Sequence, residues 1–174
     1  PSKLTSNLLV IPGVGSVGPY MERLKKTSFD KAILEHVDLG GRVIGICLGF
    51  QIMGECSDED GGVECLKILK GRVVKNSDGE SHNGWETIHL NRNELAGQTF
   101  SSEFKLTQKK LLNGRVFYNH EYSFVNDDDG SFNMPISNKH PKYSALVIKD
   151  KIIGIQFHPE KSQITGVDLA SLVL

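Results

Sequence analysis

Two short apolar runs, each bounded by a break, limit most tightly what this chain can fold into. Residues 8–11 read Leu-Leu-Val-Ile and end at a Pro-Gly pair, and residues 42–46 read Arg-Val-Ile-Gly-Ile and follow a Gly-Gly pair. Unbroken apolar runs of this length are typical of strands buried on both faces, as in parallel sheets. Between them, apolar residues at helical spacing predict helix over residues 19–36, split near Thr27 and Ser28. This order indicates an α/β fold.

The second half of the chain predicts an added antiparallel β region. Residues 91–112 have no clean period, so turns and irregular strands are expected there. The last two predicted strands form a hairpin, and the strands predicted at residues 115–118 and 144–148 flank an acidic turn at residues 126–130. We find no repeat or linker, so residues 1–174 are expected to form one domain. Strands are predicted at residues 72–74, 87–90, 115–118, 144–148 and 152–157.

Charge and cysteine content narrow the class of partner. Lys and Arg number 20 against 21 Asp and Glu, which gives a formal net charge of −1, so no net field draws the chain to nucleic acid or to an anionic membrane. No apolar run approaches the roughly 18 residues of a membrane span. Three cysteines without a Cys-x-x-Cys pair favour a reducing compartment. These features predict a cytoplasmic protein with a small-molecule or protein partner.

Cys47 is the first residue that could carry chemistry. It lies where the second buried run meets a helical pattern, and Gly45 and Gly49 flank it in the form of a nucleophile elbow. We expect the amides at the start of the helix to lower the pKa of the thiol and the Leu48 N–H to face a substrate oxyanion. A cysteine at the end of an apolar strand is more often structural, so a second piece of evidence is needed.

The second piece is the segment Phe157-His158-Pro159-Glu160. A histidine released at a strand end can serve as a general base, and a carboxylate two residues further on can hold its imidazole in one tautomer. A histidine before proline is otherwise usually a residue of a surface turn. Cysteine, base and orienting acid together favour nucleophilic catalysis.

Residues 45–51, Gly-Ile-Cys-Leu-Gly-Phe-Gln, and residues 156–162, Gln-Phe-His-Pro-Glu-Lys-Ser, resemble the two signatures of class I glutamine amidotransferases. Within that class, residues 12–15, 82–85 and 161–163 resemble the glutaminase subunit of imidazole glycerol phosphate synthase. The likeness covers nearly the whole chain. It implies a doubly wound, mostly parallel, flavodoxin-like sheet with an added antiparallel β region, and it implies no cofactor and no metal.

The resemblance also implies roles for individual residues. Cys47 would attack the side-chain amide of L-glutamine, His158 would pass its proton to the leaving ammonia, and Glu160 would steady His158. The family usually has Ser or Thr where Glu121 stands, so that contact is expected from the backbone. Residues matching the family's substrate contacts are Gly13, Val14, Leu48, Gln51, Glu59, Glu121 and Tyr122. Residues 12–15 match its oxyanion strand, in which glycine makes a peptide rotation easy.

A protein partner follows from the same resemblance. Trp85, Phe117 and Lys161 match positions that meet a barrel-shaped cyclase subunit in a heterodimer, where the released ammonia would be used to make imidazole glycerol phosphate in histidine biosynthesis. Asn83 and Glu86 depart from the family's H-x-G-W-N motif and leave open a paralogue that aminates a surface-polysaccharide sugar. Family members carry a strand, a helix and a strand before this segment, so we expect a truncated N-terminus. Because of that expectation, a catalytically silent regulatory copy remains an alternative function.

Other readings of these motifs are weaker. Residues 13–18 satisfy G-x-G-x-x-G after a strand, but the next strand ends without an acidic residue to bind a ribose. A related cysteine hydrolase or peptidase would use the same elbow without the glutamine signatures. Residues 126–130 lack the downstream glutamate of a calcium loop. The remaining candidate metal ligands lack ligand spacing: Cys56, Cys65, His82 and His89.

Overall fold

The computed structural model describes residues 6–77, 81–90, 112–137 and 139–173. The expectation for residues 91–112 lies outside these ranges except for Leu112, which begins a strand. The helices are α1 Val17–Thr27, α2 Phe29–Asp38, α3 Leu48–Gln51 and α4 Gln163–Val173, with short 3-10 turns η1 Glu59–Gly61 and η3 Pro159–Lys161. The strands are β1 Leu8–Ile11, β2 Arg42–Ile46, β3 Cys56–Ser57, β4 Val63–Glu64, β5 Gly71–Lys75, β6 His82–Leu90, β7 Leu112–His120, β8 Tyr122–Asn126, β9 Phe132–Ser137, β10 His140–Lys149 and β11 Ile152–Ile155.

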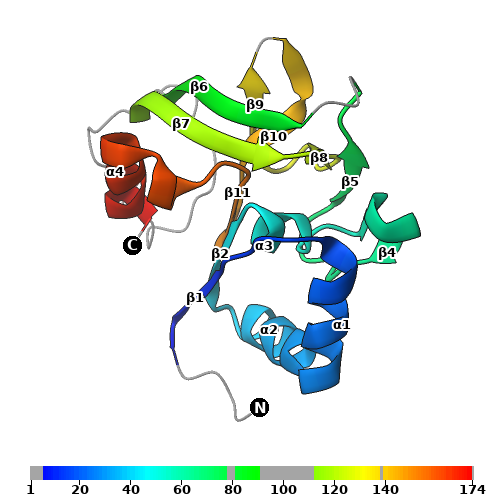
Figure 1. The fold of residues 1–174 in the computed structure, drawn as a ribbon. Helices are drawn as coiled ribbons and strands as arrows, with labels where there is room; N and C mark the ends of the chain where they lie inside the picture. The colour runs from blue at the N-terminus through cyan, green and yellow to red at the C-terminus, as the bar shows by residue number, and fades with distance from the viewer. Residues whose placement is uncertain (1–5, 78–80, 91–111, 138, 174) are drawn as a thin grey trace.

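A mixed sheet with the strand order β1-β2-β11-β10-β9 forms the centre of the molecule. The strands β1, β2 and β11 are parallel, and β10 and β9 continue the sheet in antiparallel fashion. Helix α4 lies on one side of this sheet and α1, α2 and α3 lie on the other (Figure 1). Neighbouring residues of β2 face opposite cores: Ile44 packs with Leu169 of α4, whereas Val43 packs with Ile33 of α2. The α/β class and helices on both faces are therefore confirmed.

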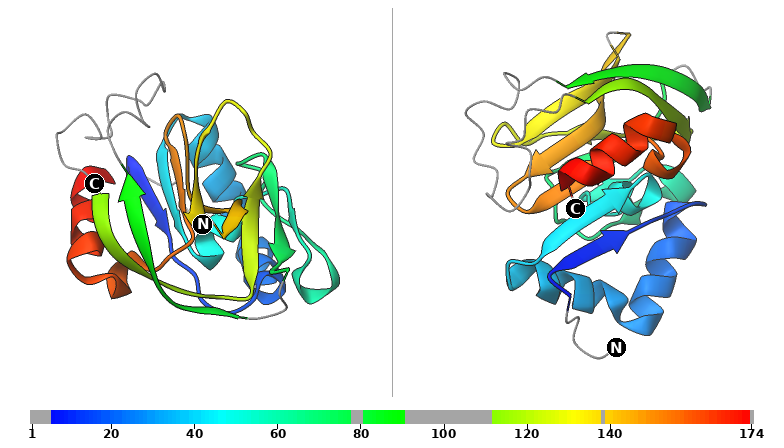
Figure 2. Two further views of the ribbon diagram at one scale, coloured as in Figure 1. Left: turned by 90° about the horizontal axis from the view of Figure 1, so that it is seen from above. Right: turned by 90° about the vertical axis from the view of Figure 1, so that its left-hand side faces the viewer.

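The added β region consists of two smaller sheets. One has the order β4-β3-β5-β8, and the other is the long antiparallel pair of β6 and β7, which lies across one end of the central sheet (Figures 1 and 2). The hairpin of β10 and β11 is confirmed, and its turn places Asp150 at φ 51°. The split of the first helical segment is also confirmed, because Ser28 takes up φ 58° between α1 and α2. No helix in the described ranges is long and apolar enough to cross a membrane.

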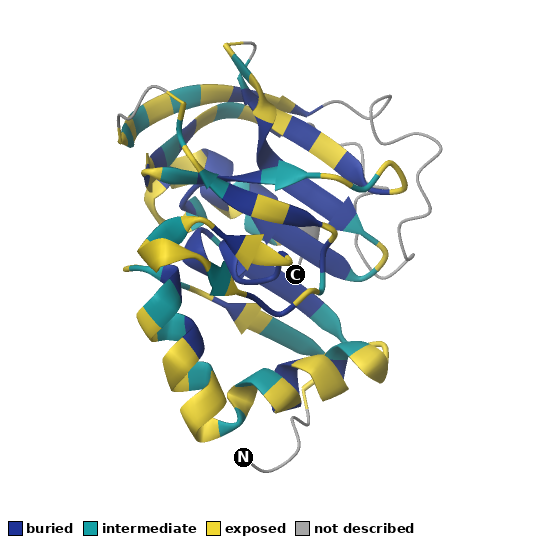
Figure 3. Cartoon of the chain, turned by 90° about the vertical axis from the view of Figure 1, so that its right-hand side faces the viewer, coloured by how far each residue is buried: buried dark blue, intermediate teal, exposed yellow. Residues whose placement is uncertain are grey.

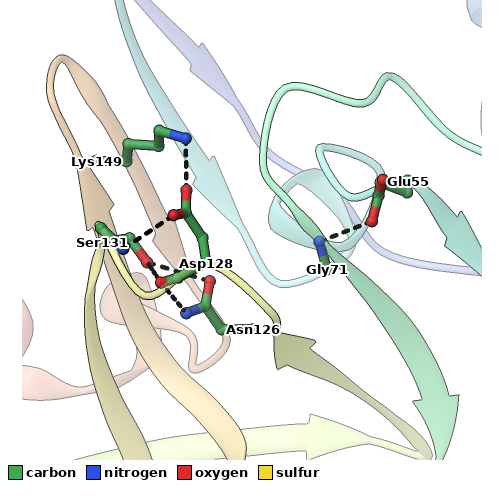
Figure 4. Close-up of polar contacts among 7 residues, drawn as sticks. Glu55, Gly71, Asn126, Asp128, Ser131 and Lys149 are labelled. Carbon is green, nitrogen blue, oxygen red and sulfur yellow. Dashed lines mark hydrogen bonds and ion pairs between the residues drawn. The ribbon is translucent and has the colours of Figure 1, made fainter.

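The acidic turn is closed by its own side chains (Figure 4). Asp128 accepts a hydrogen bond from the Gly130 N–H at 3.0 Å and also contacts the ammonium of Lys149, which holds the pKa of Asp128 below its usual range. Ser131 donates to the Asp128 carbonyl at 2.9 Å. The strands directly flanking the turn are β8 and β9, so the predicted neighbours at 115–118 and 144–148 are one strand further away on each side.

Two paired glycines allow α3 to lie directly on the sheet. Gly45 of β2 pairs with Gly154 of β11; β11 is buried along its whole length, and β2 is buried over its three middle residues (Figure 3). A Cβ atom on Gly154 would lie 2.0 Å from the Phe50 ring, and one on Gly45 would lie 2.4 Å from the sulfur of Met53. Side chains at either position would push α3 away from β2. The short turn that follows Cys47 therefore depends on both glycines.

We predict that Gly154→Ala destabilises the fold, because the new methyl group overlaps the ring of Phe50, which has no exposed surface. Overpacking of this kind costs about 1–3 kcal/mol. Gly84→Ala on β6 is the matched control, since its Cβ atom would meet nothing within 4 Å. The measurement is the free energy of unfolding in urea. Equal stability of the two variants would show that the centre of the sheet has room that the structure does not show.

Candidate active site

Cys47 occupies a strained turn between β2 and α3. Its backbone has φ 52° and ψ −111°, a backbone conformation that residues other than glycine rarely adopt. Its N–H donates to the Ile155 carbonyl at 2.7 Å, and its own carbonyl accepts from the Gln51 N–H at 3.0 Å. On the far side of the turn, a Cβ atom on Gly49 would lie 1.8 Å from the Ile11 carbonyl oxygen. Close backbone contacts with β11 and β1 thus hold the nucleophile elbow in place.

His158 follows β11 and is held from both sides. Its N–H donates to the Phe117 carbonyl at 2.8 Å, and its carbonyl accepts from the Ser162 hydroxyl at 2.6 Å. The Ser162 oxygen in turn accepts from the Phe117 N–H at 3.1 Å. The imidazole is only 3% exposed, and its Nδ1 lies 2.8 Å from Oε1 of Glu160. This contact places a proton on Nδ1 and leaves Nε2 as the basic nitrogen.

Cys47 and His158 line one cavity of about 120 Å³. Six of the seven residues predicted to bind substrate line it as well; the exception is Gly13, whose Cβ position lies 2.7 Å from Leu48 and from Gly49 beneath the cavity. Lys161, which was assigned to the partner surface, also lines it, whereas Glu160 contacts the cavity through His158. The lining residues are Val14, Gly15, Cys47, Leu48, Gln51, Glu59, Asn119, His120, Glu121, Tyr122, His158 and Lys161.

The prediction of a lowered thiol pKa is wrong for the ligand-free chain. Burial, with smaller contributions from the negative charges of Glu160 and Glu59, raises the pKa of Cys47 to about 11. The backbone N–H of Leu48 bonds to the sulfur and opposes this effect, as does the charge of Lys161. Desolvation outweighs the amide because the thiolate is almost cut off from water. Ionisation of Cys47 therefore requires a base within the cavity.

Glu59 links the cavity to the start of α1. Its Oε2 accepts from the Val17 N–H at 3.0 Å, and Asp60 beside it accepts from the Gly18 N–H at 2.8 Å. Burial raises the pKa of Glu59, the hydrogen bond from Val17 lowers it, and the charges of Asp60 and Glu121 raise it further. A cation in the cavity would relieve this repulsion between carboxylates.

The loop of residues 12–15 is fixed at both ends and open in its middle. Tyr20 on α1 donates a hydrogen bond of 2.7 Å to the Pro12 carbonyl, and Glu59 holds the first amide of α1. Between these anchors, Val14 is 78% exposed, and Gly15 has φ 101° with open space where a side chain would lie. Gly15 therefore offers little steric hindrance to rotation of a peptide group in this loop.

The three residues predicted to meet a partner lie together. Trp85 and Phe117 are register partners on β6 and β7, with ring centroids 5.5 Å apart. The ammonium of Lys161 lies 5.5 Å from the Phe117 ring, and the guanidinium of Arg115 lies 5.6 Å from the Trp85 ring. Trp85 is 37% exposed. We call these four residues the aromatic patch, and because Lys161 also lines the cavity, the patch adjoins it.

His120 forms the wall of the cavity behind Glu121. Its Nδ1 is 3.0 Å from the Tyr122 carbonyl, which can only accept, so this nitrogen carries the proton. The ring packs edge-on against His82, and Nε2 is buried with no hydrogen-bond partner among the described residues. Burial, together with a smaller contribution from the charge of His82, lowers the pKa of His120 to about 3. His120 is therefore neutral at physiological pH.

Because the pKa of His120 is depressed in the folded chain, unfolding takes up a proton below the unfolded pKa of about 6.5. Stability should be fully present above that pH and be lost as pH falls toward 3. We predict that His120→Gln makes the loss shallower by about 1.4 kcal/mol per pH unit near pH 5. The check is urea unfolding at several pH values, with the exposed His89→Gln as control. An unchanged slope would refute the buried neutral imidazole.

The sequence analysis gave no individual role to four residues in or beside the cavity, although two of them fall in the segments 12–15 and 156–162 that it matched to the family: Gly15, Asn119, His120 and Gln156. The first three line the cavity, and Gln156 contacts the sulfur of Cys47 from below. Asn119 and His120 directly precede the pair of predicted substrate contacts Glu121 and Tyr122, and Gln156 is two residues before His158. That adjacency was the available signal. In the described residues no group of three or more His, Cys, Asp or Glu side chains could hold a metal ion.

Comparison with known proteins identifies the family of this chain. A family model described as glutamine amidotransferase class-I matches residues 2–167. The chain therefore belongs to the class I glutamine amidotransferases, a family of enzymes. Curated relatives within it carry the name imidazole glycerol phosphate synthase subunit HisH. The one from a Geobacillus species is 36% identical over 165 residues, which cover 92% of this chain and 74% of the relative. The one from Chlorobaculum tepidum is 30% identical over 164 residues, which cover 92% of this chain and 77% of the relative.

Solved structures share the fold at lower identity. PurLQS from Thermotoga maritima superimposes with a TM-score of 0.66 at 20% identity, over 98% of this chain and 81% of that one. A structure described as a glutamine amidotransferase gives a TM-score of 0.62 at 16% identity, over 95% of this chain and 77% of that one. Likeness at this level of identity concerns the arrangement of strands and helices alone.

Proposed function

We propose that this chain hydrolyses L-glutamine to glutamate and ammonia and delivers the ammonia to a barrel-shaped partner that makes imidazole glycerol phosphate in histidine biosynthesis. The observation that carries the proposal is the shared cavity, which brings Cys47, His158 and six predicted substrate contacts together. The relatives named imidazole glycerol phosphate synthase subunit HisH support the choice of pathway.

In the proposed reaction, Nε2 of His158 takes the proton of the Cys47 thiol, and the thiolate attacks the side-chain amide carbon of glutamine. The protonated His158 then gives that proton to the leaving nitrogen, so ammonia departs and a thioester remains. Water, deprotonated by His158, attacks the thioester and releases glutamate and the thiol. Glu160 stabilises the imidazolium through its bond to Nδ1 in both steps. Because the pKa of Cys47 is high, proton transfer and attack must be closely coupled.

Selection of glutamine over a simple amide is assigned to the carboxylates at the far end of the cavity. Glu59 and Glu121 both line it, and the charge of Glu121 raises the pKa of Glu59. The α-ammonium group of an amino acid would neutralise this pair. The side chain of Glu121 thereby has a use that the usual Ser or Thr could not provide.

Transfer of ammonia is assigned to the aromatic patch. Lys161 belongs both to the patch and to the cavity wall, so a protein covering the patch would also cover the cavity next to Lys161. Exposed Trp with Arg beside it is the composition that dominates binding energy in protein interfaces. A partner seated there would receive ammonia without its passing through solvent.

We expect Cys47→Ala to abolish glutamate release in the presence of a histidine-pathway barrel subunit, because no other described side chain near His158 can form the thioester. Binding of that subunit should be unchanged, since Cys47 is buried. Cys56→Ala, which removes an exposed thiol, is the matched control and should retain full activity. Glutamate release that survives in Cys47→Ala would exclude Cys47 as the nucleophile.

Trp85→Ala should weaken binding of the barrel subunit by about 30-fold, the equivalent of about 2 kcal/mol for loss of an interface aromatic anchor. Titration calorimetry measures the dissociation constant of the complex with the barrel subunit. Leu39→Ala is the control, because Leu39 is 65% exposed at the end of α2, on a different part of the surface. Equal loss of affinity in both variants, or in neither, would remove the aromatic patch from the interface.

The same assays separate the alternative functions. A wild-type chain that binds the barrel subunit and releases no glutamate would be a silent regulatory copy. A chain that does not bind this subunit, and that releases glutamate with the barrel partner of a sugar-aminating system, would be the surface-polysaccharide paralogue. Asn83 and Glu86 leave that alternative open.

A further inference from the structure

We propose that Gln156 is an additional catalytic residue, whose side-chain N–H donates to the sulfur of Cys47 and stabilises the thiolate. This inference rests on the proposed role of Cys47 as nucleophile. Gln156 lies just after β11, two residues before His158, and has 0% exposed surface. Its backbone N–H bonds to the Ala145 carbonyl at 2.9 Å, and its Nε2 is 3.9 Å from Sγ of Cys47.

The orientation of the Gln156 amide follows from its neighbours. The Tyr122 carbonyl can only accept a hydrogen bond, and it lies 2.7 Å from one terminal atom of Gln51, so that atom must be the nitrogen Nε2. The same nitrogen lies 3.3 Å from Gln156, where it needs an acceptor, so the facing atom must be Oε1. The other terminal atom of Gln156 is then its N–H₂ group, and that group faces the sulfur. A backbone carbonyl thus fixes the direction of both amides.

A donor at this position acts more strongly on the thiolate than on the thiol. A neutral thiol accepts hydrogen bonds weakly, whereas an anionic acceptor roughly doubles their strength. The contact at 3.9 Å is long for a thiol and would strengthen as charge develops on the sulfur. The Leu48 amide is the other N–H that bonds to this sulfur. Two fixed donors therefore meet the buried charge that the reaction creates.

An ordinary structural role predicts something different. A buried glutamine whose only task was to fill space would need partners for its own amide, and removing it would open the core around Cys47. A loosened core exposes the thiol, so its reaction with an alkylating reagent would become faster. Loss of a thiolate donor makes that reaction slower. The sign of the change distinguishes the two roles.

The test measures alkylation of the full chain by iodoacetamide between pH 6.5 and 9.5, with the rate at each cysteine followed by mass spectrometry of its peptide. Gln156→Met keeps the length of the side chain and removes the donor. We expect the Cys47 rate at pH 7.5 to fall about tenfold, which corresponds to a rise of about one pH unit in its profile. Gln156→Glu, which sets a carboxylate against the sulfur, should be slower still.

Two other thiols serve as internal controls. Cys56 is exposed and reports any change in the reagent, and Cys65 is buried and reports unfolding. Gln163→Met, a substitution of the same kind on the surface, should match the wild type. A Cys47 rate that is unchanged or increased in Gln156→Met, or a Glu variant no slower than the Met variant, overturns the proposal.

This readout needs no glutamine and no partner. If Cys47→Ala retains glutamine hydrolysis, the nucleophile is another residue, and the alkylation profile still decides whether Gln156 bonds to the sulfur. If hydrolysis depends on Cys47 and the Gln156 variants alkylate like the wild type, the proposed function stands and this inference fails.

Discussion

The site depends on the close approach of three backbones around Cys47. The carbonyl of Ile11 lies against Gly49, the carbonyl of Ile155 accepts from the Cys47 N–H, and Gly45 leaves room for α3. A residue with φ 52° stays in that conformation only when its surroundings hold it there. The parallel strands β1, β2 and β11 supply those surroundings because their carboxyl ends meet at one edge. The cavity, the base and the loop of residues 12–15 are all arranged around this turn.

Burial has two opposing effects at this site. It raises the pKa of Cys47 and so favours the protonated thiol of this proposed nucleophile, and it also makes each nearby donor more effective once charge appears. The groups that contact the sulfur, the Leu48 amide and Gln156, are fixed by the fold before any substrate arrives. The donors to the sulfur are therefore in place before any charge develops on Cys47.

Local sequence patterns predicted the parts of the structure that local physics determines. The apolar runs became β1 and β2 at the expected residues, and the turn at 149–151 formed the hairpin of β10 and β11. The strand β8 was not predicted, because only Glu121 separates it from β7 and no turn residue marks the change of sheet. The predicted direction of the Cys47 pKa shift was wrong because burial depends on segments far apart in sequence, such as those of Leu48 and His158, that come together around one cavity.

The Ser162 hydroxyl links the backbone of His158, beside the cavity, to the backbone of Phe117 in the aromatic patch. It accepts from the Phe117 N–H and donates to the His158 carbonyl, and the His158 N–H returns a bond to Phe117. Three hydrogen bonds thus hold the backbones of His158 and Phe117 together. Because the His158 backbone is bonded to Phe117 both directly and through the Ser162 hydroxyl, a displacement of β7 at Phe117 would carry the backbone of His158 with it.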